Sequence, residues 1–172
     1  MGNDFVLAPL CESRILQAYP LVREVAPDVS LEAWRAYAQT VLRPRRRDGR
    51  GIVAVYSENE YLRGLFVYRI VPDMQGGRAL VLECFVVSSL FVPHAVASAL
   101  LAGAEDVARE HGCGTIRAEL RRRPDWLDAL LHEHGYDHRA CTLGKPVTSK
   151  DVPARGRTRP SPAGSRTSPS PD

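Results

Sequence analysis

Apolar residues recur at helical spacing in the first quarter of the chain. Between residues 7 and 25 they fall mostly three or four positions apart, but Pro20 interrupts the repeat, so we expect one kinked helix or two short ones. Ser30 precedes a second apolar stripe and is placed to cap a helix there, which Pro44 would end. This stripe consists of Leu31, Trp34, Tyr37, Ala38, Val41 and Leu42.

Three strand-like runs follow, at residues 52–56, 61–71 and 79–88. The two segments that join them are short and rich in turn-forming residues, which predicts an antiparallel meander. The third run is apolar on both faces except for Glu83, so we expect a central strand that is covered on both sides.

The helical period returns at residues 93–111, where Gly112 would end a helix. A short strand at 113–120, a helix at 124–134 closed by Gly135 and a last strand at 136–143 complete the order. This order predicts an α/β protein, with one mixed sheet and helices on both of its faces.

Length and composition indicate a single folded domain followed by a tail. The chain has 172 residues, 44% of them apolar, which is enough for one substantial core and too little for two ordinary domains. We expect the domain to span residues 1–147. Residues 148–172 are rich in Pro, Ser and Arg, and we expect them to be disordered because they bury too little apolar surface to offset the entropy of ordering.

Charge and cysteine content exclude several classes of protein. The net charge is only +3, which disfavours nucleic-acid binding, and no apolar run could span a membrane. The four cysteines lie far apart without a Cys-x-x-Cys pair, so we expect buried reduced thiols in a cytoplasmic protein.

His132, His134 and His138 lack the spacing of a metal motif, and no metal is expected. The basic run at residues 43–50 fits a solvated loop better than a binding site for an acidic substrate or a phosphate group.

Several segments, in this order and spacing, resemble the GNAT superfamily of N-acetyltransferases over roughly residues 19–147. They are Tyr-Pro-Leu-Val-Arg-Glu at 19–24, Gly-Leu-Phe-Val-Tyr-Arg at 64–69, Leu-Glu-Cys-Phe-Val-Val at 82–87, the helical stretch at 99–113 and His-Gly-Tyr at 134–136. The resemblance implies a splayed central sheet. In that family the fourth strand separates from the fifth, the pantetheine arm of acetyl-CoA lies between them, and the pyrophosphate meets the N-terminus of the next helix.

The resemblance also implies which residues hold acetyl-CoA. The end of the splayed strand and the start of the following helix supply them: Phe85, Val86, Val87, Ser88, Ala95, Val96, Ala97 and Ser98. The family's phosphate loop is degenerate here, because Val92 replaces a polar residue and Ala95 replaces a glycine, which should weaken anion binding. Because the loop at 90–92 is apolar, a longer-chain or carrier-linked acyl thioester is an alternative acyl donor. The required gap between strands is expected near Val86 and Cys113.

Glu83 is the candidate catalytic residue, as the base that deprotonates the amine. Its alternative interpretation is a sheet carboxylate paired with an arginine such as Arg69 or Arg117. The family's usual acid is a tyrosine, and the matching position here is Leu131, which cannot donate a proton. Tyr136 fits the core better than the chemistry, and the neighbouring thiol of Cys84 is expected to be inert.

Two functions therefore remain open at this stage. The first is an acyl-CoA-dependent N-acetyltransferase that acts on a small-molecule or peptide amine in a ternary complex. The second is a non-catalytic relative that has lost CoA and serves as an interaction or regulatory module. An exposed last strand could also pair two copies edge to edge as a homodimer.

Overall fold

The computed structural model describes residues 5–43, 49–74, 77–88, 93–120 and 124–137, all within one compact unit, Met1–Arg139. Four sequence-based expectations therefore lie wholly or largely outside the described residues. They concern the tail, most of the strand at 136–143, the middle of the basic loop and the apolar loop at 90–92. The proposed domain limits stay predictions.

The described strands form one sheet in the order β1-β2-β3-β4-β5. Their bounds are Val6–Pro9 for β1, Arg50–Tyr56 for β2, Leu62–Pro72 for β3, Arg78–Val87 for β4 and Thr115–Ala118 for β5. Neighbours from β1 to β4 pair antiparallel, and β5 pairs parallel to β4. The predicted meander and mixed α/β sheet are confirmed. The expectation of a helix from residue 7 is wrong for residues 7–9, which belong to the edge strand β1. This strand has four residues, no alternation of polar and apolar positions, and a proline at its end, so its own pattern does not reveal it.

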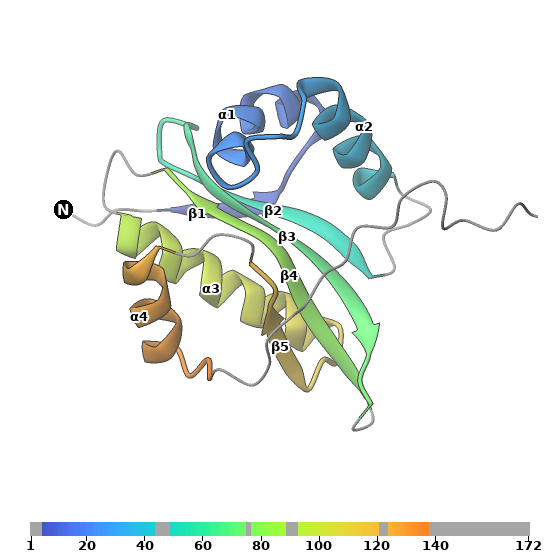
Figure 1. Ribbon diagram of the computed structural model, residues 1–172, viewed down its shortest axis with the longest axis vertical. Coiled ribbons are helices and arrows are strands. Elements are labelled where there is room, and N and C mark those ends of the chain that lie inside the picture. The colour runs from blue at the N-terminus through green and yellow to red at the C-terminus, as the bar shows by residue number, and fades with distance from the viewer. Residues whose placement is uncertain (1–4, 44–48, 75–76, 89–92, 121–123, 138–172) are drawn as a thin grey trace, which may run out of the picture. The chain divides into compact units, whose positions relative to one another are not determined.

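Helices cover both faces of the sheet (Figure 1). One face carries the short 3₁₀ turn η1 (Glu12–Arg14), α1 (Ile15–Val25) and α2 (Leu31–Leu42), and the other carries α3 (Pro93–Glu110) and α4 (Asp125–Glu133). No helix in the described ranges is both long enough and apolar enough to cross a membrane.

The local signals in the sequence explain where the first two helices begin and end. The Ser30 hydroxyl accepts a hydrogen bond from the Ala33 amide at 3.2 Å, as a cap should. Arg43, just before Pro44, is extended with ψ of 129°, which a following proline favours. α1 is a single helix that runs through Pro20, whose side chain is exposed, so water can satisfy the carbonyl that lacks an N–H partner.

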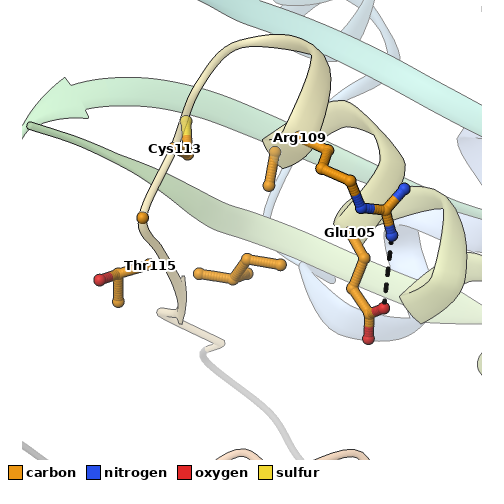
Figure 2. Close-up of a pocket in the computed structure, with 7 residues that line it drawn as sticks. Glu105, Arg109, Cys113 and Thr115 are labelled. Carbon is orange, nitrogen blue, oxygen red and sulfur yellow. Dashed lines mark ion pairs between the residues drawn. The ribbon is translucent and has the colours of Figure 1, made fainter.

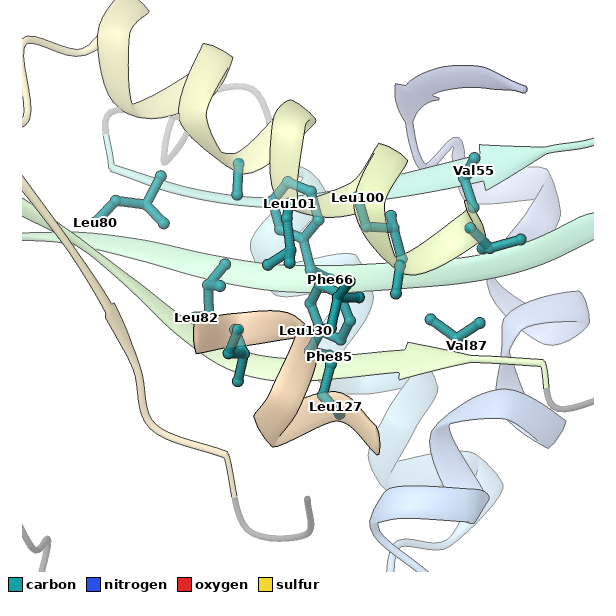
Figure 3. Packing of buried hydrophobic residues seen from close by; sticks show 14 of the residues in the cluster. Val55, Phe66, Leu80, Leu82, Phe85, Val87, Leu100, Leu101, Leu127 and Leu130 are labelled. Carbon is teal, nitrogen blue, oxygen red and sulfur yellow. The ribbon is translucent and has the colours of Figure 1, made fainter. Parts of the chain in front are cut away.

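Two apolar clusters fill the spaces above and below the sheet. On the α3 side, Phe66, Leu82, Phe85 and Leu100 belong to one buried cluster that α4 completes with Leu127 (Figure 3). The other cluster lies under α1 and α2 and consists of Leu10, Ile15, Ala18, Leu21, Val22, Trp34, Ala38, Val41, Ile52, Ala54, Tyr56, Leu65, Val67 and Val86. β4 contributes to both clusters, which confirms the prediction of a central strand covered on both sides.

The first strand also contacts α3 closely. The side chain of Leu7 occupies the position that a Cβ on Gly103 would take. Glycine at 103 therefore lets α3 lie close to β1.

Candidate active site

The pairing between β4 and β5 is short. It runs from Ala79 opposite Thr115 to Leu82 opposite Ala118, and a last hydrogen bond joins the Glu119 amide to the Leu82 carbonyl at 2.9 Å. β4 continues to Val87, so its last five residues have no partner on β5. The expected position near Cys113 is wrong, because that residue precedes β5 at its paired end, where the Gly114 amide bonds the Arg78 carbonyl at 2.9 Å.

Glu83 is the residue at which β4 leaves its regular ladder with β3. Val67 pairs with Cys84 and Tyr68 pairs with Leu82, which leaves Glu83 as an extra residue in a β-bulge. The bulge changes which side chains face each way: Leu82 and Phe85 both pack on the α3 side, and Cys84 packs on the α1 and α2 side. The Glu83 side chain also reaches α2.

Both carboxylate oxygens of Glu83 have partners. Arg69 Nε, from β3, lies 2.6 Å from Glu83 Oε1, and the Tyr37 hydroxyl of α2 donates to Glu83 Oε2 at 3.0 Å. The same guanidinium reaches Glu119 Oε2 through Nη2 at 3.0 Å. We call Tyr37, Arg69, Glu83 and Glu119 the Arg69 cluster. Of the two arginines considered for Glu83, the partner is Arg69, since Arg117 pairs with Asp73 at 2.7 Å.

The Arg69 cluster is partly open to solvent. The side chains of Arg69, Glu83 and Glu119 are 28%, 30% and 37% exposed. Partial burial of the phenol raises the pKa of Tyr37 far above its usual value, and the charge and hydrogen bond of Glu83 add to the shift. Tyr37 therefore stays protonated at neutral pH and remains a donor to the carboxylate.

The cysteine next to Glu83 is unreactive at neutral pH. Burial raises the pKa of the Cys84 thiol to about 12, with a smaller contribution from the Glu83 charge. The thiolate is the nucleophilic form, so a thiol with this pKa is a poor nucleophile. The described thiols of Cys11, Cys84 and Cys113 are all free, but Cys11 is exposed, contrary to the expectation of burial.

The predicted cofactor residues of β4 offer mainly backbone to a ligand. The side chains of Phe85, Val86 and Val87 are buried in the two clusters. Ser88 is half-buried, and its amide already donates to the Arg63 carbonyl at 2.7 Å. A thin ligand at this edge would therefore meet strand N–H and C=O groups more than side chains.

The predicted residues at the start of α3 also include both buried side chains and groups that a ligand can reach. Ala95 is exposed, whereas the side chains of Val96 and Ala97 are buried in the core. Ser98 Oγ lies 3.4 Å from His134 Nε2, and the His94 ring packs against Trp126 with centroids 5.2 Å apart. These contacts join the first turns of α3 to α4. The backbone amides that precede the first i→i−4 bonds are those of His94 and Ala95, since Pro93 has no N–H, and these are what the helix presents to an anion.

The position of the family's usual acid is filled by a core residue. Leu131 is 4% exposed and belongs to the α3-side cluster. Tyr136 packs against the same cluster, and its buried hydroxyl has no hydrogen-bond partner among the residues that the structure describes. Neither residue places a proton donor beside Glu83.

A shallow hollow of about 260 Å³ lies at the other end of β5 (Figure 2). Its wall includes Cys113, Gly114 and the ion pair between Arg109 and Glu105 at 3.9 Å. It contains none of the predicted site residues. Within the described ranges, no three metal-ligating side chains come together.

Sequence reasoning missed two members of the Arg69 cluster. Tyr37 was assigned to an apolar helix stripe, and it does lie at the edge of that stripe, next to the Trp34 ring. Glu119 follows β5, and an acidic residue just after a strand is too common to mark a functional site. Only the folded structure shows that Tyr37 contacts Glu83 and that Glu119 shares Arg69 with it.

Comparison with known proteins places this geometry in a family. A model of the acetyltransferase (GNAT) family matches residues 15–136. The fold of the described residues is that of solved N-acetyltransferases. The chain belongs to the GNAT acetyltransferase family.

Solved structures agree with this fold. An aminoglycoside N-acetyltransferase, AAC(6′)-Iy, in complex with CoA is 14% identical, with a TM-score of 0.73 over 86% of this chain and 97% of that one. A ribosomal-protein-alanine N-acetyltransferase from Brucella melitensis biovar Abortus 2308 is 17% identical, with a TM-score of 0.66 over 84% and 100%. A transcriptional regulator from Bacillus halodurans C-125 is 16% identical, with a TM-score of 0.69 over 84% and 100%. Curated protein sequences give no match.

Proposed function

We propose that this protein is an acyl-CoA-dependent N-acetyltransferase that moves an acetyl group to a primary amine by direct attack in a ternary complex. One observation carries the proposal: β4 continues for five residues beyond its last pair with β5 and leads towards the N-terminus of α3. Membership of the GNAT family supports it.

The chain offers acetyl-CoA a backbone site. The edge of β4 at residues 85–88 faces no β5 partner and fits the amides of a pantetheine arm, and the first turn of α3 fits a pyrophosphate. Bound acetyl-CoA would supply the acyl group as a thioester. Pro93 has no N–H and Ala95 carries a Cβ, so we expect weaker phosphate binding than at a glycine-rich loop.

Glu83 is the proposed acceptor for the proton that the attacking ammonium group must lose. Arg69 and Tyr37 each use one oxygen, but a carboxylate oxygen has two acceptor positions, so Glu83 keeps room for the amine or an intervening water. The Tyr37 hydroxyl beside it donates to the carboxylate, and its pKa is raised far above the usual value, so we assign it no role as the acid. A thiol of the cysteine type has a pKa of about 8.5, so the CoA thiolate can leave near pH 8 and take its proton from water.

Calorimetry and turnover of one variant test this function. We expect acetyl-CoA to bind the wild type and Glu83→Gln equally, whereas Glu83→Gln lowers kcat/KM for a reactive amine by about 100-fold, the usual scale for loss of a general base. Glu110→Gln, at the exposed end of α3, is the control and should match the wild type. Absence of acetyl-CoA binding at millimolar concentration would refute the proposal.

The second candidate function is a non-catalytic interaction module. It is favoured by the aliphatic side chain of Leu131 at the family's acid position and by the engagement of Ser98 with His134. The same experiment separates the two functions. CoA-dependent acetylation of any amine, reduced by Glu83→Gln, would eliminate the module.

A further inference from the structure

Arg69 contacts carboxylates from two different strands. Its Nε lies 2.6 Å from Glu83 on β4, and its Nη2 lies 3.0 Å from Glu119, just after β5. The guanidinium is planar and presents its N–H donors in a fixed fork, so holding two carboxylates constrains both of them.

The two carboxylates lie where β4 and β5 stop pairing. The Glu119 amide makes the last hydrogen bond of the parallel ladder, to the Leu82 carbonyl, and Glu83 is the next residue of β4. Arg69 reaches both from β3. It therefore connects the two strands by side chains at the point where their backbone pairing ends.

Glu83 depends on such contacts for its orientation. As the extra residue of the bulge it has no residue opposite it on β3, so the ladder does not fix its side chain as it fixes its neighbours. Arg69 holds one oxygen and Tyr37 holds the other. Together they fix the carboxylate along the α2 side of the sheet.

We propose that Arg69 is a positioning residue for amine acetylation: it orients the Glu83 carboxylate and couples that orientation to the end of β5 through Glu119. This inference rests on the proposed function of Glu83 and adds a role for three residues that the sequence did not reveal as a group. Tyr37 supplies the second fixed contact.

The exposure of the Arg69 cluster separates this role from a structural one. Ion pairs that are about a third exposed contribute little to folding stability, because solvent screens them. Loss of Arg69 should therefore leave the fold intact. Its effect should appear in turnover, where small displacements of a reacting group have large effects on rate.

The test compares Arg69→Met, Arg69→Lys and Glu119→Gln with the wild type, using acetyl-CoA and a reactive primary amine. We expect Arg69→Met to lower kcat by about tenfold or more, since misplacement by about 1 Å can cost about 100-fold. Acetyl-CoA affinity and thermal stability should stay close to those of the wild type. Arg69→Lys should recover part of the loss, because an ammonium keeps the charge without the fork, and Glu119→Gln should give a smaller loss than Arg69→Met.

Arg109→Met is the matched control. Arg109 also lies beside two carboxylates, Glu105 and Asp106, but at the far end of α3. Its replacement should leave kcat unchanged.

A double variant shows whether Arg69 acts through Glu83. In the Glu83→Gln background, Arg69→Met should cost nothing further, because residues that act as a unit are not additive. An active wild type with Arg69→Met equally active, or a full additional loss in the double variant, would overturn this inference alone. A wild type that neither binds acetyl-CoA nor acetylates the amine would overturn the proposed function and, with it, this role.

Discussion

Leu82 and Phe85 face the same side of the sheet although they are three residues apart, which regular alternation forbids. The extra residue that makes this possible is Glu83. The sequence identified Glu83 as the one polar residue in an apolar run. In a run that is apolar on both faces, polar and apolar positions do not alternate, so the position of a bulge cannot be seen in the sequence. Of its two partners, Arg69 was one of the two arginines that the sequence offered. Tyr37 could not be predicted, because it comes from α2, which is far from Glu83 in the sequence.

Tyr136 provides a test at the residue scale, because its hydroxyl is buried with no hydrogen-bond partner in the described part of the chain. An unpaired buried hydroxyl costs about 1–3 kcal/mol, so Tyr136→Phe should match or exceed the wild type in free energy of unfolding by urea at pH 7. Burial raises the pKa of Tyr136 from 10 to about 12. The unfolded chain thus ionises first, and stability falls as pH rises from 10 to 12; the variant should lose less over this range.

The control for this experiment is Tyr61→Phe, since the Tyr61 side chain is 59% exposed. Tyr37 and Tyr56 also have raised pKa values, so they contribute to the loss of folding stability at high pH. The contribution of Tyr136 is therefore the difference in that loss between Tyr136→Phe and the wild type. A Tyr136→Phe protein that is clearly less stable at pH 7 would show that the hydroxyl makes a useful bond.

At the scale of elements, most long periodic segments were predicted within one or two residues. The exceptions are the first helix, which was expected from residue 7 and begins at Ile15, and the short strands. Ser30, Gly112 and Gly135 mark the ends of helices as expected, with φ of +64° at Gly112 and +79° at Gly135. β1 was missed and β5 is shorter than predicted, because an edge strand of four residues is defined by its partner and not by its own pattern. The extent of the β4–β5 ladder depends on register, which no local signal encodes.

Gly64 tests the packing between β4 and α3. A Cβ there would lie 2.7 Å from the Val86 carbonyl and 3.0 Å from Leu100 Cδ1, so backbone or helix must move. We expect Gly64→Ala to lower the free energy of unfolding by about 1–3 kcal/mol, the usual cost of overpacking, and to weaken acetyl-CoA binding by displacing Val86.

Gly114→Ala is the corresponding control, because a Cβ there meets nothing within 4 Å. Urea unfolding and calorimetry on both variants give the comparison. Equal stability of Gly64→Ala and the wild type would mean that β3, β4 and α3 fit together more loosely than the structure shows.

The whole molecule follows from the order of its elements. Two helices, a meander and alternating helices and strands predicted a mixed sheet with helices on both faces, and the structure confirms it. The family resemblance rested on short segments in the right order, and the family match over residues 15–136 confirms that too. The acceptor could not be predicted, because specificity depends on which loops surround the site in space.

The proposed boundary at residue 147 is testable at this scale. We predict that a chain ending at Val147 melts within about 2 °C of the full chain, since residues 148–172 offer little apolar surface to a core. Acetyl-CoA affinity should also be unchanged. Thermal denaturation and calorimetry on the two chains decide it, and a large drop in either quantity would place part of the tail within the domain.

The contact between Leu7 and Gly103 links the beginning of the chain to the helix that carries the proposed phosphate site. Since one leucine fills the space beside that glycine, the first strand sets how deeply α3 can sit on the sheet. Removing this strand would leave a space of one side chain under the middle of the helix, so we expect a change in the first strand to alter the position of the proposed phosphate site.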